Sequence, residues 1–309
     1  MNFKTSAIAL AVAGTVAAPV AVQAGADEIY ASARVGIENV DTAGTSDLRV
    51  RSYGSRFGMR GETDLGNGLT GFGRYEWDVD FADHGNDSDD DIDLRHRYTG
   101  IKGDFGSLLF GQTYHTFYNH VVGPVDNPWW GSGYAMVNYR GRTGNAITYA
   151  GSTGAVSFGV TGYFVWETEE DAPDQTEFGA SFGVGDMTLG VALQSSETAH
   201  GSAGTDDDII GVALSGIALG DASLALNFMS QEDDTSLTVD VGIGNVYVHV
   251  EQHSVDATDA DRLSTTIGYT QSLGRKTTMW YEFVNVDNDT GNSDDDVGVL
   301  RAVLKYDII

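Results

Sequence analysis

The sequence lacks several features that would identify other classes of protein. It contains no cysteine, which excludes a disulfide framework and a cysteine nucleophile. Only 4 of its 309 residues are proline, and no stretch shows the sustained periodicity of an amphipathic helix. The P-loop and H-E-x-x-H motifs are absent, so these nucleotide and zinc signatures are missing. What remains is a chain with 40 glycines and turn residues throughout.

The first residues have the pattern of an export signal. Lys4 is followed by the apolar stretch Ala7–Ala18, and Val22-Gln23-Ala24 resembles a small-residue cleavage site. The alternatives are a buried N-terminal helix and a membrane-spanning helix, but a spanning helix needs about 20 apolar residues. We therefore expect residues 1–24 to be a cleaved signal peptide and residues 25–309 to form the mature chain, beginning at Gly25.

Beyond residue 24, apolar and polar residues alternate with a period of two. From Ile29 to Glu38 the apolar side chains occupy odd positions, while Tyr30, Ser32 and Arg34 occupy even ones. Short turns such as Leu65-Gly66-Asn67-Gly68 alternate along the chain with longer acidic connections, at residues 83–93, 167–177, 204–208 and 287–296. Strands with this alternation, joined by short and long connections in turn, are typical of a membrane β-barrel with short periplasmic turns and longer outer loops.

The length of the chain fits this interpretation. We identify sixteen candidate strands in the 285 residues that remain when 24 are removed from 309, or about 18 residues for each strand and its connection. A tilted membrane strand needs about 9–11 residues. A wide barrel holds water, so its inner face can be polar while its outer face meets lipid. The sequence therefore predicts an all-β fold, a transmembrane antiparallel β-barrel of about 16 strands.

Three segments resemble a known family. They are "SRFGMRGETDLGNGLTGFGRYEW" (Ser55–Trp77), "RHRYTGIKGDFGSLLFGQ" (Arg95–Gln112) and "YRGRTGNAITYAG" (Tyr139–Gly151). They resemble the second to sixth strands of the general porins of Gram-negative bacteria. The resemblance implies a trimeric, 16-stranded barrel whose third loop folds inward and narrows the pore. That loop is expected at residues 113–138.

The basic residues are unevenly placed. Of the 17 Lys and Arg residues, eleven lie between Arg34 and Arg142, and none lies between residues 143 and 261. Alternation puts six arginines of the early strands on the face away from lipid: Arg34, Arg56, Arg60, Arg74, Arg95 and Arg97. Arg140 and Arg142 stand where the third loop would rejoin the wall. The resemblance implies that such arginines face acids of the third loop across the constriction. Local pairing with Glu62, Glu76 and Asp78 is the alternative.

The third loop departs from the family pattern. Enterobacterial porins have an acid after the proline that is Pro128 here, whereas this chain has Trp129, and Asp126 is the only acid of the loop. We expect Asp126, Trp129 and Trp130 to line the constriction; interfacial anchoring or a trimer contact is the alternative for the tryptophans. Two further departures are Gln112, where the family often has arginine, and Ile309, where it ends on phenylalanine.

The function implied by the resemblance is passive diffusion of small hydrophilic solutes and ions through the outer membrane. The partners it implies are two further copies of the chain, outer-membrane lipid and lipopolysaccharide. The formal charge of −28 favours cations at the pore mouth, or reflects a saline habitat. We expect no catalytic residue, cofactor or nucleic acid partner. We also expect no metal, since the acids at Asp287–Gly291 lack the EF-hand order. An outer-membrane hydrolase and a closed structural or adhesive barrel are the alternatives.

Overall fold

The computed structural model describes residues 23–24, 27–82, 92–126, 133, 135–137, 139–164, 175–196, 208–256, 260–288 and 296–309. Almost all of the described residues lie in β-strands. Among them, no helix has both the length and the apolar character that crossing a membrane requires.

The described elements of the first half of the chain are β1 (Gln23–Ala24), β2 (Glu28–Thr42), β3 (Thr45–Ser52), β4 (Ser55–Gly66), β5 (Leu69–Val79), β6 (Ile92–Gly103), β7 (Gly106–Tyr114), the π-helix η1 (Tyr118–Val122), β8 (Arg142–Thr143) and β9 (Ala146–Thr153). Those of the second half are β10 (Val156–Tyr163), β11 (Gln175–Val184), β12 (Met187–Ser196), β13 (Ile209–Leu219), β14 (Ala222–Gln231), β15 (Asp234–Ile243), β16 (Val246–Val255), β17 (Ala260–Gly274), β18 (Thr277–Asp287) and β19 (Val297–Asp307).

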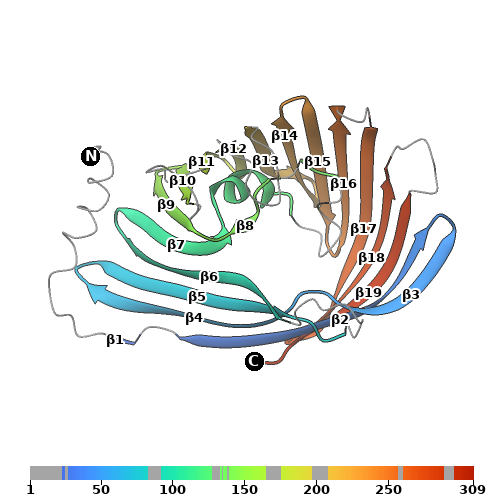
Figure 1. The fold of residues 1–309 in the computed structure, drawn as a ribbon, viewed down its shortest axis with the longest axis horizontal. Coiled ribbons are helices and arrows are strands. Elements are labelled where there is room, and N and C mark those ends of the chain that lie inside the picture. Colours follow the sequence, from blue (N-terminus) through green and yellow to red (C-terminus); the bar gives the residue numbers. More distant parts are fainter. Residues whose placement is uncertain are drawn as a thin grey trace.

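The strands form a closed ring (Figure 1). Neighbours along the chain pair in antiparallel fashion, and β19 pairs with β2 from Val297↔Thr42 to Asp307↔Ser32, which closes the barrel. β3 and β4 both pair with β2 and are two halves of one strand. Counting them as one, and omitting the two-residue segments β1 and β8, gives sixteen strands in the described part of the chain. The predicted sixteen-stranded antiparallel barrel is confirmed.

Tight turns fix the register of the hairpins. Between β4 and β5, Asn67 and Gly68 both have positive φ, 53° and 75°. Two consecutive left-handed residues form the hairpin turn whose twist matches that of the strands, and asparagine and glycine adopt it with the least strain. The Asn-Gly turn pairs Gly66 with Leu69, and a bulge at Leu65 then shifts the register so that Arg60 lies opposite Arg74.

The two faces of the barrel have opposite character. Large apolar side chains are exposed on the outer face, for example Leu300 at 61% and Phe283 at 47%. The neighbouring inward positions hold Arg301 and Glu282, which are 3% and 1% exposed. An ordinary soluble sheet has the reverse arrangement, with its apolar face covered. The alternation read from the sequence thus separates a polar interior from an apolar exterior.

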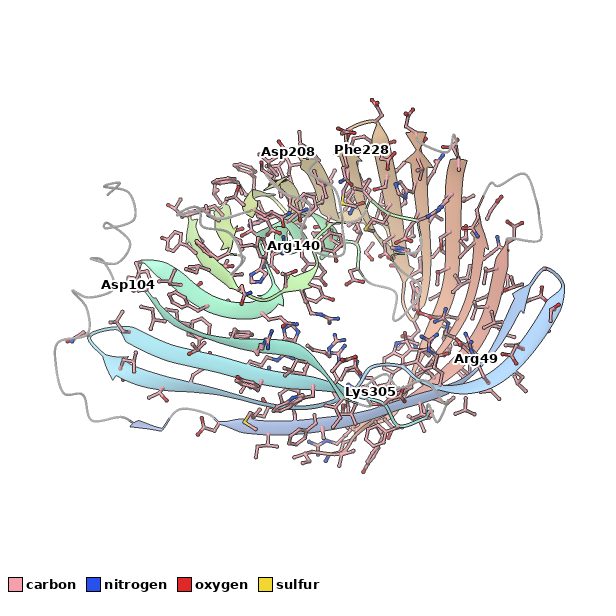
Figure 2. All side chains as sticks on the ribbon, viewed as in Figure 1. Arg49, Asp104, Arg140, Asp208, Phe228 and Lys305 are labelled. Atoms are coloured by element: carbon pink, nitrogen blue, oxygen red, sulfur yellow. The ribbon has the colours of Figure 1, made fainter. Side chains whose placement is uncertain are left out.

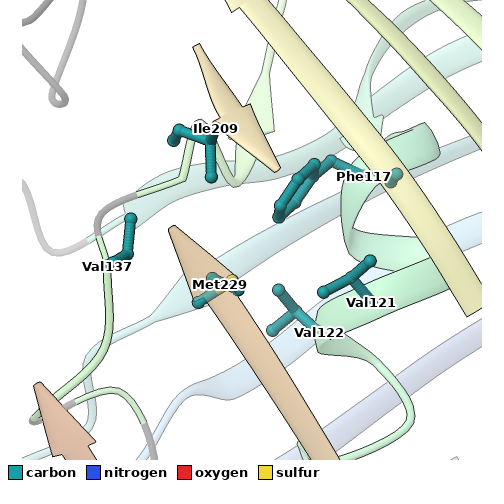
Figure 3. Packing of buried hydrophobic residues seen from close by; sticks show 7 residues of the cluster. Phe117, Val121, Val122, Val137, Ile209 and Met229 are labelled. Atoms are coloured by element: carbon teal, nitrogen blue, oxygen red, sulfur yellow. The ribbon is translucent and has the colours of Figure 1, made fainter. Parts of the chain in front are cut away.

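An apolar cluster lies inside the ring (Figure 3). The π-helix η1 packs against β11, β12 and β13, and Figure 1 shows it within the circle of strands. The buried members of the cluster come from the connection and from three strands: Phe117, Val121, Val122, Val137, Ala192, Ile209 and Met229. These apolar contacts attach the connection between β7 and β8, residues 115–141, to one side of the barrel wall. We call this segment the β7–β8 connection.

Candidate pore constriction

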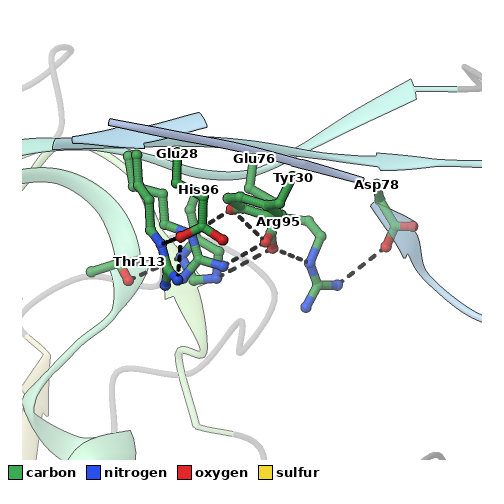
Figure 4. Close-up of polar contacts among 9 residues, drawn as sticks. Glu28, Tyr30, Glu76, Asp78, Arg95, His96 and Thr113 are labelled. Carbon is green, nitrogen blue, oxygen red and sulfur yellow. Dashed lines mark hydrogen bonds and ion pairs between the residues drawn. The ribbon is translucent and has the colours of Figure 1, made fainter. Parts of the chain in front are cut away.

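The inner faces of β2, β4, β5 and β6 carry a group of arginines. We call Arg34, Arg56, Arg74 and Arg95 the arginine cluster. Figure 4 shows how its polar contacts converge on Glu76, which is fully buried. Arg74 Nη2 lies 2.5 Å from Glu76 Oε2 and Arg95 Nε lies 3.1 Å from Oε1. Because like charges repel in a poorly solvated wall, this buried carboxylate stabilises the cluster.

Some of the arginines are paired locally, as the alternative interpretation supposed. Arg95 also contacts Asp78, with Nη1 3.1 Å from Oδ2. Arg60 pairs with Glu28 at 2.5 Å, while Glu62 pairs with Lys102 rather than with an arginine. The other two members of the arginine cluster are Arg34, which is almost fully buried on β2, and Arg56, which lies on β4. The Nε of Arg56 is buried and has no hydrogen-bond partner among the described residues.

The cluster borders a cavity of about 330 Å³. Its lining includes the cationic side chains of Arg34, Arg56, Arg60, Arg74 and Lys305 and three carboxylates. The strand ladder explains why these residues meet. Arg34 is paired with Lys305 across β2 and β19, and Arg60 with Arg74 across β4 and β5.

A β-bulge changes the faces of β6. Glu76 pairs with His96 and Trp77 with Leu94, so Arg95 is an extra residue in the ladder. Arg95 and His96 consequently both point inward, whereas Arg97 lies opposite Tyr75 on the outer face. The expectation that Arg97 shares the face of Arg95 does not hold, because one extra residue reverses the alternation that follows it.

His96 takes the inward position that strict alternation assigns to other residues. Its Nδ1 lies 3.0 Å from Thr113 Oγ1, and its Nε2 lies 3.8 Å from Glu76 Oε1. The sequence did not single out this histidine, because only the bulge turns it toward the arginine cluster.

Arg140 and Arg142 lie where the β7–β8 connection rejoins the wall, and Figure 2 shows Arg140 inside the ring. The backbone N–H of Arg140 donates to Gln194 Oε1 at 3.0 Å, and its guanidinium bonds Gln175 and lies over the Tyr163 ring at 4.7 Å. Arg142 lies over the ring of Tyr114 at 5.0 Å. Both arginines therefore lie over aromatic rings where the connection meets the wall.

Asp126 accepts a hydrogen bond of 2.8 Å from the hydroxyl of Tyr118, which stacks on Tyr114 with ring centroids 3.7 Å apart. Burial raises the pKa of Tyr118 above its usual range, and the neighbouring carboxylate of Asp126 raises it further. The phenol therefore stays a donor to Asp126 at neutral pH. The predicted constriction residues Trp129 and Trp130 lie outside the described residues.

Two buried carboxylates of the wall bind the backbone of the β7–β8 connection. Glu177 on β11 accepts from the Phe117 N–H at 2.9 Å. Further along the same arc of the wall, Glu251 of β16 accepts from the N–H groups of Gly133 and Ala135, at 2.6 and 3.1 Å. Glu251 is held in turn by His249, whose Nε2 lies 3.0 Å from Oε1. These residues were not predictable from the sequence, since inward polar positions recur on every strand and only the fold brings these to the connection.

The part of the chain that the structure describes contains no group of three or more His, Cys, Asp or Glu side chains arranged to hold a metal. The predicted removal of residues 1–24 stays a prediction; β1, which belongs to that segment, pairs with Thr63 and Asp64 of β4.

A comparison with known protein families shows the family of this chain. The family model described as Gram-negative porin matches residues 5–291. The chain belongs to the Gram-negative porin family. The resemblance found in three sequence segments is therefore confirmed, and the protein is located in the outer membrane. Its apolar outer face is the surface that meets lipid.

Two curated relatives match this porin over a short region. Outer membrane porin PhoE of Enterobacter cloacae is 40% identical over 65 residues, which is 21% of this chain and 18% of the relative. Outer membrane porin C of Serratia marcescens is 35% identical over 65 residues, 21% of this chain and 17% of the relative. The matches thus span about a fifth of the length of these relatives.

Solved structures show that the whole porin fold is shared. An anion-selective porin from Comamonas acidovorans has a TM-score of 0.72 and 18% identity, with 92% of this chain and all of that one covered. OmpF of Salmonella typhi, in complex with daunomycin, has a TM-score of 0.70 and 17% identity, over 91% of this chain and 98% of that one. OmpT of Vibrio cholerae, in its trimer form, has a TM-score of 0.70 and 15% identity, over 92% and 100%.

Proposed function

We propose that this porin forms a water-filled channel for the passive diffusion of small hydrophilic solutes and ions, assembled as a homotrimer in outer-membrane lipid and lipopolysaccharide. The observation that carries the proposal is the arginine cluster on the inner face of a closed barrel, with charged side chains bordering a cavity. In a barrel plugged by a dry core these like charges would repel one another strongly. In an open channel, water and counter-ions screen the repulsion. No turnover and no cofactor are part of the proposal.

We further propose that the β7–β8 connection narrows the channel. Its described parts are attached to one arc of the wall, from β11 to β16, by Glu177, the apolar cluster and Glu251. In the strand order this arc lies across the ring from β2, β4, β5 and β6, so a connection attached to its inner face narrows the space in front of the arginine cluster. The aperture would then lie between the arginine cluster and the connection, where Arg140, Arg142, Asp126, Trp129 and Trp130 complete it.

Ion selectivity depends on two opposing groups of charges. The acidic connections, most of which lie outside the described residues, concentrate cations at the pore mouth, whereas the arginine cluster attracts anions locally. The Debye length is about 30 Å at about 0.01 M salt and about 8 Å at about 0.15 M. Distant acids are therefore screened first, and we propose a cation preference at low salt that weakens as salt rises.

The test is the reversal potential of the purified porin in a planar bilayer under a salt gradient. Replacing Arg56, Arg95 and Arg140 together with glutamine should strengthen the cation preference. Arg97→Gln is the matched control, because it removes a cation from the outer face of the barrel and should leave the reversal potential unchanged. A triple variant that equals the wild type at both salt concentrations would refute the proposed constriction. A folded barrel without any conductance would refute the channel.

A further inference from the structure

His115 joins the two ends of the β7–β8 connection. It is the first residue after β7 and is 1% exposed. Its Nε2 lies 2.9 Å from the carbonyl oxygen of Thr143, the last residue of β8 and 28 positions further along the chain. A carbonyl oxygen can only accept a hydrogen bond, so Nε2 carries the proton and donates it. This bond closes the base of the connection where it leaves and re-enters the wall.

The other ring nitrogen belongs to a chain of hydroxyl groups. His115 Nδ1 lies 2.8 Å from Thr148 Oγ1, which lies 3.0 Å from Thr161 Oγ1, and this atom lies 2.9 Å from Thr116 Oγ1. In a neutral imidazole whose Nε2 donates, Nδ1 must accept. Thr148 therefore donates to His115, Thr161 donates to Thr148, and Thr116 donates to Thr161. All three threonines are buried, and the network holds both ends of the connection against β9 and β10.

Protonation of His115 is incompatible with this arrangement. A second proton on Nδ1 would turn it into a donor, and Thr148, Thr161 and Thr116 would each have to reverse the direction in which they donate. A positive charge would also be buried where no carboxylate of the described residues bonds the ring. A charge placed in such a site costs several kcal/mol unless it is paired, so the protonated ring favours leaving the site.

The charged and titratable groups around the ring do not offset that cost. Tyr163 presents the edge of its ring to His115 at 5.3 Å, and Arg140 lies on the Tyr163 ring. Glu177 bonds the Tyr163 hydroxyl at 2.8 Å and does not bond His115. Burial lowers the pKa of His115 to about 4; the Thr143 carbonyl opposes this shift, and the positive charge of Arg140 adds to it.

We propose that His115 is a positioning residue whose neutral imidazole clasps the two ends of the β7–β8 connection, and that its protonation loosens the connection inside the pore. The proposal rests on the proposed function, because it assumes that the connection lines an open channel. It assigns to this porin a built-in response to acid, located at the base of the connection and separate from the arginine cluster.

The direction of the response follows from linkage. The pKa of His115 is lower in the clasped state than the ordinary value of 6.5. The clasp is therefore at full strength above about pH 6.5 and weakens as the pH falls toward about 4. With these two values, the equilibrium between unclasped and clasped states shifts by a factor on the order of 50 between about pH 7.5 and about pH 4.5.

Single-channel recording tests the proposal. The wild-type porin, His115→Gln and the control His253→Gln are compared in planar bilayers at about pH 7.5 and about pH 4.5. Glutamine retains an N–H donor that reaches toward Thr143 but does not titrate. The wild type and the control, whose histidine lies on β16, should show brief closures at least about tenfold more often in acid. His115→Gln should change less than about twofold, and an acid response equal to that of the wild type would overturn the proposal.

A second measurement separates this inference from the channel itself. In detergent micelles, the imidazole signals of His115 are followed by NMR as the pH is lowered, together with hydrogen exchange of the amides at residues 116–122 corrected for the intrinsic rate. The expected result is a titration near pH 4 accompanied by loss of amide protection. Titration near pH 6.5, or protection that persists when the ring is charged, would overturn the role of His115 even if no conductance is observed.

Discussion

Truncation of Phe117 should undock the β7–β8 connection while leaving the barrel intact. The ring is fully buried within the apolar cluster, whose other members come from η1, from Val137 and from β12, β13 and β14. Replacing a buried phenylalanine with alanine costs about 3–5 kcal/mol through lost burial and the cavity that remains. Because Phe117 is not part of a barrel strand, the ladders of the wall are unchanged. The cost falls on the docking of the connection, and it increases the undocked population by a factor on the order of 100 or more.

The assay is single-channel conductance together with the uptake of sugars of increasing size into liposomes. Phe117→Ala should show a noisier current and admit larger sugars than the wild type. Phe228→Ala is the control, because this phenylalanine is 46% exposed on the outer face of β14. It loses the same atoms from the lipid side, and its conductance and size limit should stay unchanged.

One result would contradict the prediction for Phe117. If Phe117→Ala folds with the far-UV circular dichroism of the wild type and has the same conductance, noise and size limit, the connection does not set the aperture. The Glu177 and Glu251 contacts would then hold it without the apolar cluster, or it would lie away from the conduction path.

The remaining predictions concern processing, the lipid face and the tryptophans. Mass spectrometry of the protein from outer membranes should find a chain that begins at Gly25, and the porin should migrate as a trimer in mild detergent; a retained residue 1–24 segment would contradict the first. Leu304→Arg on the outer face of β19 should lower the free energy of unfolding by about 2–4 kcal/mol in bilayers, whereas Ser223→Arg on the inner face of β14 should cost little; equal costs would mean that the faces are reversed. Trp129→Gly should raise conductance and admit larger sugars in the liposome assay, and an unchanged size limit would place Trp129 outside the aperture.

Local pattern was sufficient for much of the barrel. The alternating residues from Ile29 to Glu38 lie within β2. They were predictable because a strand that separates lipid from a polar lumen must alternate, whatever its neighbours are. The Asn67-Gly68 turn was predictable for a similar reason, since the φ values that it needs depend on residue type.

The arginine cluster was predictable only in part. Arg34, Arg56, Arg74 and Arg95 face inward as alternation requires, because no irregularity intervenes between them and the pattern that precedes them. Arg97 does not, since the bulge at Arg95 shifts the register of β5 against β6. A bulge depends on how two strands fit together and leaves no mark in the alternation of one strand, so the inward position of His96 was also not foreseen.

By itself, then, the sequence determined which residues face lipid wherever no bulge interrupts the alternation, how many strands cross the membrane and where hairpins turn. These features follow from a period of two and from turn chemistry within a few residues. The tertiary structure alone decided which inward residues meet. His115 donates a hydrogen bond to Thr143, and Glu251 accepts one from Gly133 at a separation of 118 residues. These pairs form because closure of the ring and the path of the β7–β8 connection bring them together. Hydrogen bonds form only over about 3 Å, so such partners depend on positions in space that no local pattern encodes.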